Sequence, residues 1–180
     1  MKRDWSDLGN PAKGVVDPIV LHLGEQTRIR IVEPGYDEWL QHDIEGEDAE
    51  GRPLYRSVAC SQTLECPLCA KGRKHFPVKQ RYAVNVLDSN GDVKVLIGGS
   101  TIFKSFGNDS KHGFDVMDYE YIISKSGKGM QTTYDVVRME KSNRELPDAS
   151  KLHDLSRYSD PMTPEGVFAL LDEVGIDYDS

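Results

Sequence analysis

The stretch Arg81-Tyr-Ala-Val-Asn-Val-Leu-Asp88-Ser-Asn-Gly91, followed by Val93-Lys-Val-Leu-Ile97, predicts a β-hairpin. Alternate residues of a strand face opposite sides, which places Tyr82, Val84 and Val86 together on one face. The intervening turn ends in a glycine, as tight hairpin turns commonly do. This hairpin predicts a mainly β fold.

Similar short alternating runs occur on both sides of the hairpin. They predict further strands at Pro18–Leu23, Thr27–Glu33, Trp39–Ile44, Leu54–Ala59, Asp115–Ser124 and Gln131–Met139. A helical turn is expected at Ala70–His75, a short helix at Thr101–Phe106 with Ser100 as N-cap, and another helix at Val167–Val174 beginning near Pro164. Strands followed by a helix and more strands are the order of an OB-fold-like small barrel of antiparallel strands with one or two short helices.

We expect three parts in this chain of 180 residues. Residues 1–17, rich in charge, glycine and proline, are expected to form a flexible N-terminal arm. An OB-like nucleic-acid-binding core is expected over 18–140, with an inserted zinc-binding loop and zinc subdomain around 42–75. The remaining segment, 141–180, is expected to carry a short helix and an acidic end.

All three cysteines fall within Cys60-Ser-Gln-Thr-Leu-Glu-Cys66-Pro-Leu-Cys69. Structural zinc commonly takes three cysteines and one histidine, so a histidine is expected as the fourth ligand. His42 is preferred because it and Cys60 sit on two arms of a predicted hairpin, but the spacing of His75 after Cys69 keeps His75 as an alternative. A disulfide with a spare cysteine and a thioredoxin-like redox pair fit the sequence less well.

The metal is expected to be structural, and the protein is not expected to be an enzyme. The zinc deaminase pattern is absent, since His42 is followed by Asp43 and Ile44, and no His-Glu-x-x-His motif occurs. No apolar run approaches the roughly 18 residues that span a bilayer, and the first residues lack the apolar core of a signal peptide. A cytoplasmic location is therefore expected, where clustered cysteines favour metal binding.

The net charge of −8 hides an uneven distribution. Acidic residues crowd Asp37–Glu50, and the stretch Glu165–Ser180 carries no Lys or Arg. A basic strip without an intervening acid runs through Lys71, Arg73, Lys74, Lys79 and Arg81. Such a strip is often only a solvated surface, but it is also what phosphate binding requires.

The order of these motifs resembles the zinc-containing single-stranded-DNA-binding, or helix-destabilising, proteins of tailed phages. The resemblance runs from about Thr27 to Met139. A strand, Thr27-Arg-Ile-Arg-Ile-Val-Glu-Pro34, is followed by a histidine, a cysteine and the Cys66-Pro-Leu-Cys69 knuckle. A basic, aromatic strand follows at Lys79-Gln-Arg-Tyr-Ala-Val-Asn85, then a hairpin and a short helix containing Ile102-Phe-Lys104.

The resemblance implies non-catalytic, largely sequence-independent binding of single-stranded DNA during phage DNA replication, recombination and repair, in the host cell cytoplasm. It also implies a structural Zn2+, replication proteins as partners of the acidic C-terminal end, and self-association along DNA. A zinc-stabilised protein-interaction module that does not bind nucleic acid is the alternative, and a metal-dependent nuclease or deaminase is not favoured.

Binding of single strands uses cations along the backbone and aromatic faces on which bases stack. Phosphate contacts are expected from Arg28, Arg30, Lys79 and Arg81, and a base contact from Tyr82. The remaining candidates are Tyr55, Lys71, Arg73, Lys74, Phe103 and Lys104. For each aromatic residue, packing in the core is an equally good interpretation of the sequence.

Overall fold

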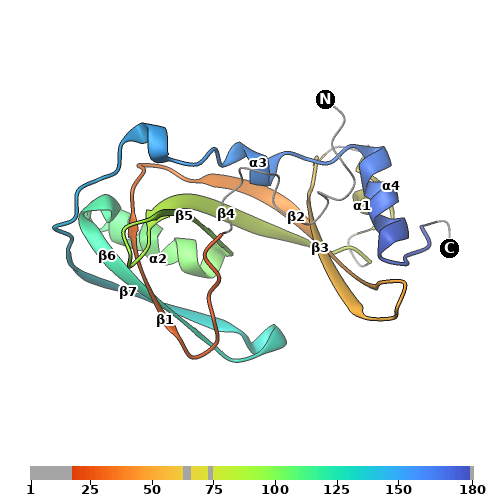
Figure 1. Cartoon of the computed structure of the whole chain (residues 1–180), viewed down its shortest axis with the longest axis horizontal. Helices are drawn as coiled ribbons and strands as arrows, with labels where there is room; N and C mark the ends of the chain where they lie inside the picture. The colour runs from red at the N-terminus through yellow and green to blue at the C-terminus, as the bar shows by residue number, and fades with distance from the viewer. Residues whose placement is uncertain (1–17, 63–65, 73–74, 179–180) are drawn as a thin grey trace. The chain divides into compact units, whose positions relative to one another are not determined.

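The computed structural model describes residues 18–62, 66–72 and 75–178 (Figure 1). The expected N-terminal arm and the candidates Arg73 and Lys74 lie outside the described residues. The described chain divides into two compact units. The cysteine unit consists of 39–80 and 156–178, apart from the gaps, and the hairpin unit consists of 18–38 and 81–155.

Antiparallel strands dominate the structure, which confirms the expected mainly β fold with few short helices. The strands are β1 (Gln26–Ile31), β2 (Asp37–Glu47), β3 (Pro53–Ala59), β4 (Val78–Leu87), β5 (Val93–Gly98), β6 (Tyr119–Ser126) and β7 (Thr133–Lys141). They join in the order β3-β2-β4-β1-β6-β7, and β5 pairs with β4. Within the described residues, no helix is both long and apolar enough to cross a membrane.

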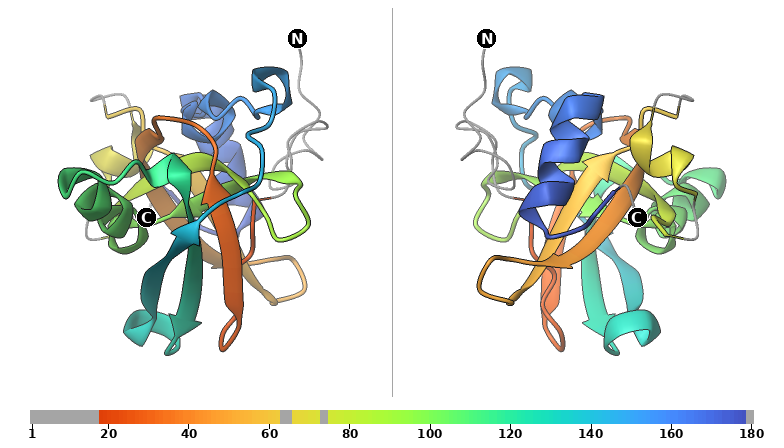
Figure 2. Two further views of the ribbon diagram at one scale, coloured as in Figure 1. Left: turned by 90° about the vertical axis from the view of Figure 1, so that its left-hand side faces the viewer. Right: turned by 90° about the vertical axis from the view of Figure 1, so that its right-hand side faces the viewer.

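In the hairpin unit, β4 and β5 form the hairpin that the sequence predicts, with Asn85 opposite Val95. β1 lies beside the β6–β7 hairpin (Figure 2, left) and places Ile29 opposite Tyr121. The helix α2 (Ser100–Lys111) covers the apolar side chains of these strands. The buried core of this unit comprises Ile29, Ile31, Val84, Val86, Leu96, Ile102, Phe103, Phe106, Tyr121 and Ile123.

In the cysteine unit, β2 and β3 form a long hairpin that pairs His42 with Val58. The helix α4 (Pro164–Glu173) lies against this hairpin (Figure 2, right). It begins as the sequence predicts, because the side chain of Thr163 accepts a hydrogen bond from the Gly166 N–H and proline occupies the first turn. The buried core comprises Ile44, Val58, Cys60, Cys66, Leu68, Phe76, Val167, Leu170, Leu171 and Val174.

Several boundaries differ from the sequence-based predictions. The predicted strand at Pro18–Leu23 is wrong, since Leu23 forms only an isolated bridge with Lys125 and Ile19 donates one hydrogen bond to the Val95 carbonyl. The helix predicted at Thr101–Phe106 with Ser100 as N-cap is α2, which begins at Ser100 with Gly99 as its N-cap and continues through Gly107 to Lys111. Gly113, with φ of +84°, follows the helix instead.

Two other short segments contain helical turns. The helical turn expected at Ala70–His75 includes residues 73–74, which lie outside the described residues; the described helical turn next to it is α1, at Pro67–Ala70, with the proline in its first turn. A 3-10 turn, η2 (Val116–Asp118), precedes β6 in the stretch predicted as continuous strand, and Asp115 caps this turn by accepting from the Met117 N–H. The remaining short elements are η3 (Gly129–Gln131), η4 (Ala149–Lys151) and α3 (Ser156–Ser159).

Candidate metal centre

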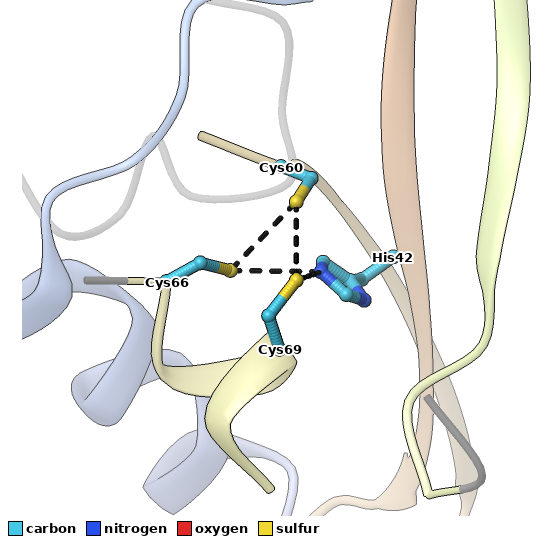
Figure 3. Close-up of side chains that lie close together, drawn as sticks. All are labelled: His42, Cys60, Cys66 and Cys69. Atoms are coloured by element: carbon cyan, nitrogen blue, oxygen red, sulfur yellow. Dashed lines mark hydrogen bonds between the residues drawn. The ribbon is translucent and has the colours of Figure 1, made fainter. Parts of the chain in front are cut away.

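Four metal-binding side chains converge in the cysteine unit (Figure 3). The Nε2 atom of His42 lies 3.6 Å from the sulfur of Cys66 and 3.5 Å from that of Cys69. The sulfur of Cys60 lies 3.9 Å from that of Cys66 and 3.4 Å from that of Cys69. All four ligand atoms fall within 4.8 Å of one another.

The four sulfur–sulfur and sulfur–nitrogen distances given above lie close to the edges of a tetrahedron around one zinc ion. Zinc–sulfur bonds of about 2.3 Å and zinc–nitrogen bonds of about 2.0 Å imply sulfur–sulfur edges of about 3.8 Å and sulfur–nitrogen edges of about 3.5 Å. The three cysteines are free thiols, and their sulfur atoms stand well beyond the roughly 2.05 Å of a disulfide bond. The donor set therefore fits a metal and not a disulfide.

Regular backbone structure holds each ligand in place. The β2–β3 pairing brings His42 close to the end of β3, where the Cys60 N–H donates to the Leu40 carbonyl at 2.7 Å. Cys66 is the N-cap of α1, and Cys69 lies within the same single turn. The hairpin and the helical turn thus supply two ligands each.

Two further contacts orient the ligands. The Nδ1 atom of His42 lies 3.0 Å from the Phe76 carbonyl, so Nδ1 carries the proton and Nε2 is left with a lone pair directed at the sulfur atoms. Gln62, with φ of +58°, donates its N–H to the Cys60 sulfur at 3.3 Å. Residues other than glycine rarely adopt this left-handed backbone conformation. At Gln62 the conformation directs the backbone N–H at a ligand sulfur.

The thiols are held in a polarised arrangement. Burial raises the pKa of Cys69 to about 12, and hydrogen bonds with Cys60 and Cys66 act in the same direction. Burial alone would raise the pKa of Cys66 as well, but hydrogen bonds from Cys69, Cys60 and the Leu68 N–H outweigh it and lower that pKa. A bound cation stabilises all three as thiolates, so metal binding releases protons.

The geometry selects His42 as the fourth ligand. His75, the alternative from the sequence, is exposed and does not belong to the cluster of ligand atoms. His42 has no exposed surface, and Cys60 and Cys66 are buried. Cys69 is half-buried. A site with four protein ligands and no open position is typical of structural zinc.

The two arginines of β1 that were predicted to contact phosphate bind other groups of the protein. Arg28 forms ion pairs with Glu120 and with Glu140, the latter at 2.6 Å. Arg30 is buried, and its guanidinium donates to the carbonyls of Met117 and Arg144. Both side chains therefore hold the hairpin unit together.

The other predicted cations lie in different surroundings. Lys79 pairs with Asp43 at 2.7 Å, and the Lys71 ammonium lies 4.7 Å from the centre of the Tyr178 ring. The Arg81 guanidinium passes close to Gly99, where an added Cβ would lie 3.9 Å from Nη1. Lys104 is exposed on α2.

Two predicted aromatic residues meet a third that the sequence did not single out. In the hairpin unit, Tyr82 stacks on Phe103 with ring centres 5.1 Å apart. Tyr36 meets both rings edge-on, at 5.7 Å from Tyr82 and 5.9 Å from Phe103, and is 58% exposed. The sequence feature that points to an exposed ring is the position of Tyr36 directly after the Pro34-Gly35 turn. Tyr55 is 66% exposed on β3 in the cysteine unit.

The fold and site define a mainly β protein with a centre of one histidine and three cysteines suited to a structural metal. Comparison of the chain with models of known protein families and with curated proteins finds no match.

Proposed function

We propose that this protein binds single-stranded DNA without catalysing a reaction, and that a structural Zn2+ stabilises its cysteine unit. The observation that carries the proposal is the exposed ring of Tyr36, supported by the stacked rings of Tyr82 and Phe103. An exposed aromatic side chain fixed by two others offers a face on which a base can stack.

The surroundings of this cluster favour a nucleic acid ligand. Lys104 is exposed on α2 directly after Phe103, so one supporting ring has a cation nearby in its helix, whereas Arg81, next to Tyr82 in β4, points to the opposite face of that strand. Stacking is tolerant of sequence because every base has a π-face, and it requires a base that is not already paired and stacked in a duplex. These features favour binding of single strands with little sequence preference.

The overall charge shapes the expected affinity. The chain carries 30 acidic residues against 22 Lys and Arg, so a broad electrostatic attraction to duplex phosphate is not expected. Arg28 and Arg30 are held by the contacts of the hairpin unit and are expected to contribute little. We therefore expect stacking to supply much of the affinity, with a modest dependence on salt.

The order of His42, Cys60 and the Cys66–Cys69 knuckle supports membership in the zinc-containing helix-destabilising proteins of tailed phages. On this proposal the protein acts in phage DNA replication, recombination and repair in the host cytoplasm. Replication proteins would be its partners, through the acidic end, and copies would associate along the DNA.

Fluorescence anisotropy with labelled oligo(dT), at low and moderate salt, tests the proposal against a duplex of equal length. We expect saturable binding of the single strand and weak binding of the duplex. Tyr36→Ala should weaken single-strand binding by about 5- to 150-fold, since stacking of one base contributes about 1–3 kcal/mol. Tyr36→Phe, which keeps the ring, is the matched control and should bind like the parent protein.

Equal affinities of the Tyr36→Ala and Tyr36→Phe proteins would refute the stacking site. Absence of any binding at low salt would favour the second candidate, a zinc-stabilised protein-interaction module. The exposed Tyr55 ring, on the strand that ends the sheet order, is the observation that favours this second candidate.

A further inference from the structure

The C-terminal segment 163–178 packs directly on the metal centre. We infer that metal binding and the docking of this segment are coupled, so that Zn2+ holds α4 on the knuckle and the docked segment strengthens Zn2+ binding. The inference concerns the cysteine unit alone and is independent of nucleic acid binding.

Ligands and helix share one core. Cys60 and Cys66 belong to the same buried cluster as Val167, Leu170 and Leu171 of α4. Leu68, between the two knuckle cysteines, has no exposed surface and belongs to this cluster too. A shift of the knuckle therefore disturbs the surface on which α4 packs.

Tyr178 attaches the end of the segment to the knuckle itself. Its hydroxyl donates to the Pro67 carbonyl at 2.8 Å, and Pro67 directly follows the ligand Cys66. The ring lies 4.7 Å from the Lys71 ammonium and meets Phe168 edge-on at 4.8 Å. One side chain thus bridges the metal loop and α4.

The opposite side of the segment is fixed to the hairpin that carries His42. The Glu47 N–H donates to the Val174 carbonyl at 3.1 Å, and Arg56 pairs with Glu173 at 2.6 Å. A Cβ at Gly46 would overlap the Val174 carbonyl oxygen, so the two backbones approach closely. The segment therefore joins the β2–β3 hairpin to α1, the two elements that supply the ligands.

The short length of α1 makes it dependent on both neighbours. It has only four residues, and isolated helices of this length do not form in water. Two metal–sulfur bonds, at Cys66 and Cys69, would hold α1 to the metal. The hydrogen bond from Tyr178 to Pro67 and the burial of Leu68 in the core shared with α4 hold it to the C-terminal segment. Because two binding events that order the same element favour each other equally, the coupling must act in both directions.

Tyr178→Phe in the full chain tests the coupling, because it removes one hydroxyl and keeps the ring. Competition with a chromogenic chelator measures the affinity for Zn2+, which we expect to fall about two- to tenfold, the equivalent of one hydrogen bond. Tyr55→Phe, at an exposed tyrosine of the same unit, is the control and should leave the affinity unchanged.

Hydrogen exchange supplies the reverse measurement. Removal of Zn2+ by a chelator should accelerate exchange of the Leu170, Leu171 and Val174 amides while β6, in the hairpin unit, stays protected. Unchanged exchange in α4, loss of protection in β6 as well, or equal Zn2+ affinities of the two Tyr→Phe proteins would each overturn the inference.

Discussion

Replacement of Glu120 by Gln should weaken the hairpin unit in a manner that depends on pH. Glu120 is 4% exposed, and its carboxylate accepts hydrogen bonds from Arg144 and from Ser142, each at 2.8 Å, and from Arg28. Burial alone would raise its pKa, but these three donors and the charge of Arg144 lower it to about 2.

The size of the effect follows from that pKa. The folded protein holds the carboxylate charged down to about pH 2, whereas the unfolded chain protonates it near 4.5. At about 1.4 kcal/mol for each pH unit between the two values, the charged carboxylate contributes about 3 kcal/mol to the free energy of unfolding. Because the folded pKa is the lower one, this contribution is complete above pH 4.5 and is lost as the pH falls towards 2.

Urea unfolding of the parent and Glu120→Gln proteins at pH 7, 5 and 3 measures the contribution. We expect the variant to lose about 3 kcal/mol at pH 7 and the difference to shrink steadily below pH 4.5. Glu140→Gln, which removes the exposed partner of Arg28, is the control and should change stability little. A difference between the parent and Glu120→Gln proteins that is the same at pH 7 and pH 3 would refute the reasoning.

Three other substitutions test the metal centre and the packing. Cys66→Ser should abolish stoichiometric Zn2+ and lower the melting temperature; full metal content by elemental analysis would contradict the assigned ligand set. Gly46→Ala should cost about 1–3 kcal/mol in urea unfolding, because its Cβ would overlap Val174, and an unchanged midpoint would argue against that close approach. Asn85→Ala should cost about 2–3 kcal/mol, since the buried amide bonds with the His153 backbone in both directions; a smaller loss would mean that this pairing adds little.

The metal centre could be predicted because its ligands have few alternatives. Only three cysteines exist, they are neighbours in the chain, and a hairpin pairs the strand of His42 with the one before Cys60. The β4–β5 hairpin could be predicted equally well. Strand β4 is buried on both faces, however, so Asn85 is buried as well as its neighbours Val84 and Val86. Local patterns sufficed in both cases.

Interactions between distant residues could not be predicted in this way. Arg28 faces outward from β1 in the alternation pattern, but its partners Glu120 and Glu140 lie 92 and 112 residues further along the chain. Nothing in the local sequence distinguishes a cation that pairs with an acid across the sheet from one that is available to bind phosphate. The role of Tyr36 cannot be predicted for the same reason, because its partner Phe103 belongs to a helix that is distant in the sequence.

The cysteine unit is assembled from two stretches of chain that the ribosome makes at different times, the ligands first and the C-terminal segment last. The bond between Tyr178 and the Pro67 carbonyl spans 111 residues. At roughly 5–20 residues per second, a ribosome completes the knuckle about 6 to 22 seconds before it reaches Tyr178. During that interval the thiols are available to zinc before the helix that covers them exists, so the nascent chain can acquire its ion first and close over it later.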